Sequence, residues 1–191
     1  WNLRRGVYGA ALPVDVLKNR KMTICDDAIL YTTGARSACR NKIDVNDIAY
    51  LVGWHIGDGH LAGSCGKKTG IVLSSGSEQA SRKLVSTLEH ELKNVLVSTT
   101  VTAKYHPTNT KVYISCRPFV EQFNVWFGGQ KAFSKRIPAE VFSWPESAKR
   151  RVIDGMIDSD GHITKAGKVI VTTVSHGLAQ DIILLLNSMG V

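Results

Sequence analysis

Apolar residues recur along the chain with two different periods, one typical of helices and one typical of strands. Between 101 and 117, apolar and polar residues alternate in two segments that Pro107-Thr108-Asn109 separates, which predicts a β-hairpin. One side of this hairpin is apolar, and the other carries Lys, Tyr, Thr, Ser and Arg. We therefore expect one face to pack on a core and a polar face to be free to meet a partner.

The other predicted elements follow an order that occurs twice. Helices are predicted near 44–58, 77–95, 119–127 and 143–160 and over a last segment that ends at Met189-Gly190, and short strands near 60–65, 69–75, after Gly161 and near 169–174. The order helix, strand, strand, helix is thus an internal repeat. Nothing in the second copy corresponds to the hairpin and aromatic helix of 98–128, so we expect that copy to be cut short.

The ends of the two repeat helices carry residues that are typical of helix termini. Asp44 and Asp47 predict the start of the first helix. Ser143 and Glu146, with Pro145 in the first turn, predict a capping box at the start of the second. These boundaries divide the chain into a basic N-terminal arm or linker (1–43), a first subdomain (44–128), a linker (129–144) and a truncated second subdomain (145–191).

The two repeat helices end in nearly the same sequence, LVGWHIGDG at 51–59 and IDGMIDSDG at 153–161. Small residues lie four apart in each copy and so share one helix face; they are Gly53 and Gly57 in the first copy and Gly155 and Ser159 in the second. Glycine costs a helix about 1 kcal/mol relative to alanine. That cost is offset if the two small-residue stripes pack on each other as a close, roughly parallel helix seam.

Parallel packing would bring Asp58 and Asp160 together at the C-terminal ends of the helices. Two carboxylates are unfavourable there because the helix macrodipole is also negative, and a bound cation relieves the repulsion. Carboxylates with the backbone carbonyls of Gly57 and Ser159 suit Mg²⁺, with Mn²⁺ as an alternative. The site then predicts metal-assisted phosphodiester hydrolysis. Gly59 and Gly161 are predicted to be left-handed caps that turn the chain into a strand. The alternative is that each Asp-Gly only ends a helix before a turn.

The overall charge favours a polyanionic partner. The net charge is +8 with a pI near 9.4, and segment 1–43 holds eight Lys or Arg against three acids, as either a solvated arm or a segment that follows phosphates. The four cysteines are scattered without a Cys-x-x-Cys pair, which argues against a zinc site and favours free thiols in an intracellular protein. No apolar run is long enough for a transmembrane helix, and no signal peptide is predicted.

Together, the paired motifs and a Lys135-x-Ile-Pro138 block resemble the LAGLIDADG (dodecapeptide) homing endonucleases, especially those embedded in inteins. The resemblance implies an α+β fold of two pseudo-symmetric αββαββα subdomains, packed through the motif helices, whose antiparallel sheets form a saddle on double-stranded DNA. It also implies a monomer, flanking splicing domains in a longer precursor, and Asp58, Asp160 and Lys135 as catalytic residues. The candidate DNA-binding residues are Lys67, Lys68, Lys104, Lys111, Tyr113, Arg117, Lys165 and Lys168.

Some residues depart from the family pattern or allow a different interpretation. The first motif has Trp54-His55-Ile56 where the family usually has two apolar residues and an Asp, and we interpret His55 as structural rather than as a ligand. Thr173-x-x-His176 matches a splicing block, but Ser175 predicts a simple helix cap at that point. Two alternatives remain, namely a non-cleaving relative such as a transcription regulator or intron maturase, and an unrelated basic structural protein.

Overall fold

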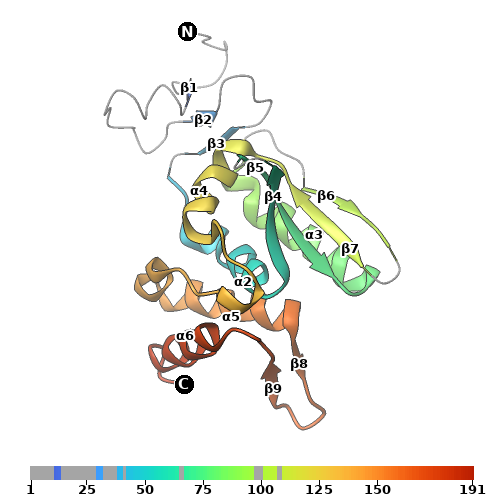
Figure 1. Cartoon of the computed structure of the whole chain (residues 1–191), viewed down its shortest axis with the longest axis vertical. Helices are drawn as coiled ribbons and strands as arrows, with labels where there is room; N and C mark the ends of the chain where they lie inside the picture. Colours follow the sequence, from blue (N-terminus) through green and yellow to red (C-terminus); the bar gives the residue numbers. More distant parts are fainter. Residues whose placement is uncertain are drawn as a thin grey trace.

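A computed structural model describes residues 11–13, 29–31, 38–40, 42–64, 67–96, 101–106 and 109–191. The fold is α+β, and Figure 1 shows the two copies of the repeat on either side of a central helix pair. The first copy contains α2 (Ala49–Asp58), β4 (Gly59–Ser64), β5 (Lys67–Ser75), α3 (Glu78–Glu91), β6 (Val101–Lys104), β7 (Thr110–Ile114) and α4 (Arg117–Phe127). The second contains α5 (Glu146–Asp160), β8 (Gly161–Ile163), β9 (Val169–Val171) and α6 (His176–Asn187). The predicted αββαββα order of the first copy is confirmed, and so is the return of the order helix, strand, strand, helix in the second.

Short elements connect and precede these two copies. The 3₁₀ helices are η1 (Val45–Asp47), η2 (Leu92–Asn94), η3 (Ala132–Ser134) and η4 (Ala139–Ser143), and a small sheet contains β1 (Ala11–Pro13), β2 (Ile29–Tyr31) and β3 (Ala38–Arg40). The phosphate-following role predicted for 1–43 falls mostly on residues outside the described ranges. Within those ranges Cys39 and Cys116 are buried thiols that form no disulfide, while Cys25 and Cys65 lie outside them.

The main sheet has the strand order β4-β5-β7-β6 and is antiparallel throughout. Its inner face is apolar, since Ile71, Leu73, Val112 and Ile114 are fully buried and pack against the helices. On β7 the residues between them point the other way, so the predicted two-faced hairpin is confirmed. The second copy has only the two-stranded sheet β8-β9.

Helices α2 and α5 pack in parallel along their small residues. A methyl group added to Gly53 would lie 1.9 Å from the Val152 carbonyl oxygen, and one added to Gly155 would lie 2.3 Å from that of Tyr50. Nearer the C-terminal ends, a methyl group on Gly57 would lie 1.9 Å from the Ser159 Oγ. Backbones this close tolerate nothing larger than glycine, and the predicted helix seam is therefore confirmed.

Helix α2 lies at the centre of the molecule (Figure 1). Its residues from Ala49 to Ile56 are all buried, because the sheet covers one side and α5 the other. A helix that is apolar on every side needs such a central position. This explains why the first motif has a continuous apolar run, whereas α5 keeps a charged outer face with Arg150 and Asp154.

The details of the predicted helix ends were partly wrong. Asp44 does cap a helix, but the short η1 rather than α2, by accepting a hydrogen bond from Asn46 N. The capping box is wrong, because Ser143 ends η4 and its Oγ donates to the Glu140 carbonyl (2.7 Å), so α5 begins without a side-chain cap. Within the described ranges, no helix has the length and apolar character required to cross a bilayer.

The left-handed caps predicted at Gly59 and Gly161 are also wrong. Both glycines are extended, with φ of −117° and −95°, because each helix leads directly into a strand. At both positions glycine is needed because a larger side chain would clash with the preceding turn of the helix. A methyl group on Gly59 would lie 2.5 Å from the His55 Cα, and one on Gly161 would lie 2.8 Å from the Ile157 Cα.

We predict that Gly155→Ala lowers the free energy of unfolding by roughly 2 kcal/mol, because its methyl group would press on the α2 backbone. Urea denaturation measures the change. Gly76→Ala is the control, since a methyl group there meets nothing within 4 Å, and its effect should stay within about 0.5 kcal/mol. If Gly155→Ala instead stabilised the protein by about 1 kcal/mol, as alanine does in an exposed helix, the close seam would be contradicted.

Candidate active site

The two motif acids lie side by side at the end of the helix seam. Asp58 is the last residue of α2 and Asp160 is the last residue of α5, and both side chains are exposed. The Asp160 Cβ is 3.5 Å from the point where a Cβ on Gly57 would stand. Partial burial raises the pKa of Asp160, and the negative charge of Asp58 raises it further, while Lys135 opposes both. The two carboxylates therefore share one electrostatic environment.

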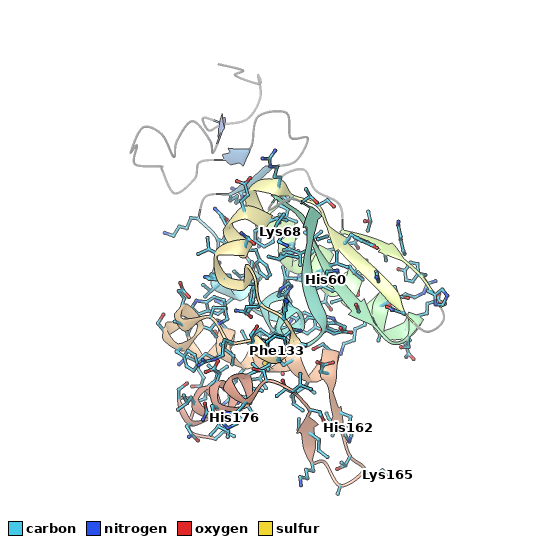
Figure 2. The ribbon with its side chains drawn as sticks, viewed as in Figure 1. His60, Lys68, Phe133, His162, Lys165 and His176 are labelled. Carbon is cyan, nitrogen blue, oxygen red and sulfur yellow. The ribbon has the colours of Figure 1, made fainter. Side chains whose placement is uncertain are left out.

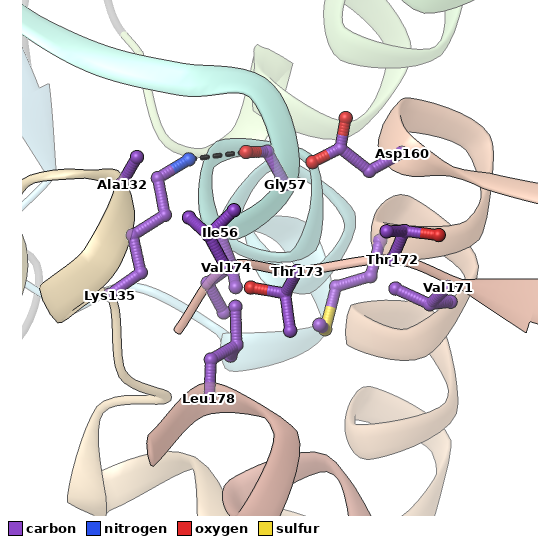
Figure 3. A pocket seen from close by; sticks show the side chains of 11 residues that line it. Ile56, Gly57, Ala132, Lys135, Asp160, Val171, Thr172, Thr173, Val174 and Leu178 are labelled. Carbon is purple, nitrogen blue, oxygen red and sulfur yellow. Dashed lines mark hydrogen bonds between the residues drawn. The ribbon is translucent and has the colours of Figure 1, made fainter. Parts of the chain in front are cut away.

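Lys135 joins these acids from the linker between the two copies. Its Nζ donates a hydrogen bond to the carbonyl oxygen of Gly57, the residue before Asp58, as Figure 3 shows. Burial lowers the pKa of Lys135, whereas the carboxylates of Asp160 and Asp58 act to raise it. The structure thus brings together the three residues for which a catalytic role is predicted.

A pocket of about 180 Å³ opens beside this group. Lys135 and Asp160 contribute the charged groups of its lining, and Ile56, Met156 and Leu178 contribute apolar surface (Figure 3). The segment that follows β9, Thr172 to Val174, completes it. The pocket therefore has space for a small chemical group next to the Lys135 ammonium and the Asp160 carboxylate.

The predicted metal ligands are placed as follows. The Gly57 carbonyl oxygen already accepts the Lys135 hydrogen bond, and the Ser159 Oγ donates to the Met156 carbonyl (3.1 Å) within α5. In the part of the chain that the structure describes, no three His, Cys, Asp or Glu residues form a metal-binding group. The donors available are two adjacent carboxylates and backbone carbonyls. This set fits Mg²⁺, which keeps several waters and takes phosphate oxygens, better than a metal that needs nitrogen or sulfur ligands.

His60 lies next to the acids and was missed in the sequence. Partial burial lowers its pKa, Lys111 lowers it further, and Asp58 opposes this, so its imidazole interacts with both Lys111 and Asp58. The missed signal is a repeated triplet, since Asp-Gly-His occurs at 58–60 and again at 160–162. His60 and His162 each hold the second position of the strand that follows a motif helix.

The candidate DNA-binding residues form three groups. Lys104 pairs with Lys111 across β6 and β7, and Thr102 pairs with Tyr113, which places all four on the outer sheet face. The Lys104 Nζ lies 5.6 Å from the Tyr113 ring centroid. Figure 2 shows Lys68 on the same sheet. Lys67 belongs to β5, but its side chain is outside the described residues.

The other three candidates lie away from the main sheet. Arg117 was expected on the second hairpin strand, but β7 ends at Ile114, and Arg117 begins α4 with its Nε 3.1 Å from the Glu121 carboxylate. Lys165 and Lys168 are exposed between β8 and β9, and Figure 2 shows Lys165 there. They form a separate basic site on the second copy.

His55 is structural, as its sequence context predicts. It is buried, and its ring centroid lies 4.4 Å from that of Phe127 and 5.1 Å from that of Phe123. Burial lowers the pKa of His55 to about 3, and the positive charges of Lys135 and His60 act in the same direction. Its side chain therefore belongs to the aromatic core rather than to the acid pair.

Comparison with known proteins agrees with this fold. Residues 147–191 match the family model of the LAGLIDADG-like domain. The chain is 27% identical over 154 residues to the replication factor C small subunit of Methanocaldococcus jannaschii, a match that covers 79% of this chain and 8% of that protein. It is also 27% identical over 162 residues to a DNA polymerase of Thermococcus litoralis, covering 83% and 9%. The chain thus spans less than a tenth of the length of these relatives.

Two solved structures give the same result for the fold. One is the crystal structure of I-DmoI in complex with DNA and Mn, with 17% identity, a TM-score of 0.59 and coverage of 78% of this chain and 80% of that chain. The other is I-DmoI in complex with DNA and Ca, with 18% identity, a TM-score of 0.55 and coverage of 78% and 74%. At this level of identity the likeness shows a shared fold.

We predict that His55 makes the protein less stable as the pH falls below about 6.5. The folded state holds this imidazole neutral down to about pH 3, whereas the unfolded chain binds a proton near pH 6.5, so acid favours unfolding. The loss contributed by His55 is at most about 1.4 kcal/mol per pH unit. Urea denaturation between pH 7 and pH 5 should therefore show a flatter profile for His55→Phe than for the wild type. His176→Gln removes an exposed histidine and should leave the profile unchanged; equal profiles for all three proteins would contradict the prediction.

Proposed function

We propose that this chain, whose residues 147–191 match the LAGLIDADG-like family model and whose fold is that of I-DmoI, is a site-specific endonuclease that hydrolyses double-stranded DNA with the help of a divalent cation. One observation carries the proposal: the helix seam places Asp58 and Asp160 together, and Lys135 reaches the same point from the linker. Two acids and an ammonium at one exposed site are the groups that phosphodiester hydrolysis needs.

The two aspartates and the lysine have different roles in this proposed reaction. Asp58 and Asp160 would hold the cation, together with backbone carbonyls at the helix ends. A divalent cation there supplies charge stabilisation on the phosphate as a Lewis acid. Lys135 presents its ammonium to the same space and stabilises the negative charge that develops on the phosphate oxygens.

The outer face of the main sheet would hold the DNA. Lys68, Lys104, Lys111 and Tyr113 lie on that face, and His60 connects it to the acids. Lysines on this face can contact DNA phosphates, which carry no sequence information, while polar side chains between them can contact base edges. The I-DmoI structures, which share the fold, contain DNA.

We also propose that this chain is an intein-type insert. Its relatives include a replication factor C subunit and a DNA polymerase, two proteins with different roles, and the match covers less than a tenth of each. A short segment common to unrelated host proteins is what a mobile insert produces. A non-cleaving regulator or maturase is the less favoured candidate, because both acids and Lys135 remain in one place.

We predict that Asp58→Asn and Asp160→Asn each slow DNA cleavage by at least about 10²-fold while the protein still binds DNA. The substrate is a pool of double-stranded DNA with a randomised segment, from which cleaved sites are selected in Mg²⁺ or Mn²⁺. Removal of divalent cations with EDTA should abolish cleavage. Asp154→Asn, an exposed acid on the same α5, should cleave normally. Unchanged cleavage by both motif variants would contradict the assigned site.

We predict that Lys104→Ala and Lys111→Ala each weaken DNA binding and reduce the slope of log affinity against log salt by about 1. Fluorescence anisotropy with a labelled duplex at several salt concentrations measures this slope. Lys149→Ala is the matched control, because Lys149 lies on α5 and its Nζ donates to Ser188 Oγ. A slope that stays the same in the two sheet variants would exclude this face as the DNA surface.

A further inference from the structure

We propose that α6 is a positioning element for the active-site lysine, acting through Ser175 and Asp181, which hold the linker residues Lys135, Arg136 and Ile137. This inference rests on the proposed endonuclease function, to which it adds residues that lie outside both motifs. It also gives a role to α6 of the second copy, which contacts the linker at residues 135–137.

Asp181 binds the residues immediately after the lysine. Its Oδ2 accepts from Arg136 Nε (2.6 Å), its Oδ1 accepts from the second guanidinium nitrogen (2.7 Å), and its Oδ2 also accepts from Ile137 N (3.0 Å). Only 3% of Asp181 is exposed, although the Arg136 side chain is largely in solvent. The buried carboxylate thus makes a bidentate pair with the arginine and accepts a backbone N–H, and bonds of this kind fix the geometry as well as adding stability. We call this arrangement the clamp.

Ser175 binds the lysine itself. Its Oγ donates to the Lys135 carbonyl oxygen (2.8 Å) and accepts from Leu178 N (3.2 Å), so the residue that caps α6 also fixes the backbone of Lys135. The Arg136 side chain packs directly against Gly177, where a methyl group would lie 2.7 Å from the Arg136 Cδ. Three consecutive linker residues are thus attached to the first two turns of α6.

These contacts set where the lysine Nζ can reach. Lys135 is held at its backbone by α6 and at its Nζ by Gly57 of α2. Catalytic groups that move by about 1 Å can lose about 10²-fold in rate. Fixing the backbone at 135 to 137 therefore keeps the ammonium beside Asp58 and Asp160, where its charge acts on both.

The first copy of the repeat shows that the fold itself does not require this acid. Ser77 caps α3 as Ser175 caps α6, by accepting from Ala80 N at 3.2 Å. Six residues after each cap, however, α3 has Lys83 and α6 has Asp181. Lys83 is exposed and pairs with Asp158 on α5 instead of holding a loop. Only the helix that contacts the linker, α6, has a buried carboxylate at this position.

The test compares two matched cap variants. Ser175→Ala and Ser77→Ala each remove one N-cap bond, worth about 1 kcal/mol, but only Ser175 touches Lys135. In single-turnover cleavage of a selected duplex, Ser175→Ala and Asp181→Asn should be 10- to 100-fold slower, with DNA affinity within about twofold of the wild type. Ser77→Ala should cleave at the wild-type rate. Equal effects of the two cap variants would overturn the proposal.

A double-mutant cycle separates positioning from general destabilisation. In a Lys135→Met background, Asp181→Asn should add no further loss of rate, because the group that it positions is already absent. If the two losses instead multiply, Asp181 acts independently of the lysine and the proposal is wrong. Circular dichroism and urea denaturation confirm that each variant is folded.

A readout without DNA keeps this proposal distinct from the nuclease function. With lysines labelled by ¹³C reductive methylation, the Lys135 signal should show nuclear Overhauser contacts to Gly57 and Ile56 protons in the wild type and in Ser77→Ala. Those contacts should be weakened in Ser175→Ala and Asp181→Asn. If wild-type protein cleaves no DNA but shows this pattern, the function fails and the positioning stands. Unchanged contacts in both α6 variants refute the positioning, whatever the activity.

Discussion

The backbone contact between α2 and α5 is the constraint on which the rest of the structure depends. Gly53, Gly57 and Gly155 allow the two helices to approach until backbone atoms meet, and this fixes their relative direction and register. Because both helices end at their motif aspartate, a fixed register also fixes the two acids beside each other. A single larger side chain in the seam would therefore change the active site as well as the stability.

The same contact creates an electrostatic problem that the other parts of the site relieve. Two carboxylates at two parallel helix C-termini repel each other and the helix macrodipoles. Lys135 supplies one positive charge, and it is held between the end of α2 and the start of α6. Lys68 and Lys111 extend positive potential onto the sheet around His60, so the acids lie at the edge of a basic surface. This arrangement suits a polyanion that arrives with a divalent cation.

The seam, the paired acids and the internal repeat could be predicted because each depends on local spacing or on comparison of the two copies. The clamp formed by Asp181 and Arg136 could not, because it joins residues 45 apart and an acid in an apolar helix gives no indication of its partner. The glycine caps were misjudged for a related reason. Helix ends next to strands are decided by tertiary packing, and Gly59 is needed for its closeness to His55 rather than for its φ angle.

The central claim is that Asp58 and Asp160 form one cation site, and paramagnetic relaxation by Mn²⁺ tests it most directly. Mn²⁺ added to ¹⁵N-labelled protein should broaden the amide signals of 57–59 and 159–161 together. Asp58→Asn should weaken the broadening at 159–161, and Asp160→Asn should weaken it at 57–59, because each acid supports the site of the other. Broadening that is confined to one helix end, or that persists across the seam in either variant, would contradict a shared site.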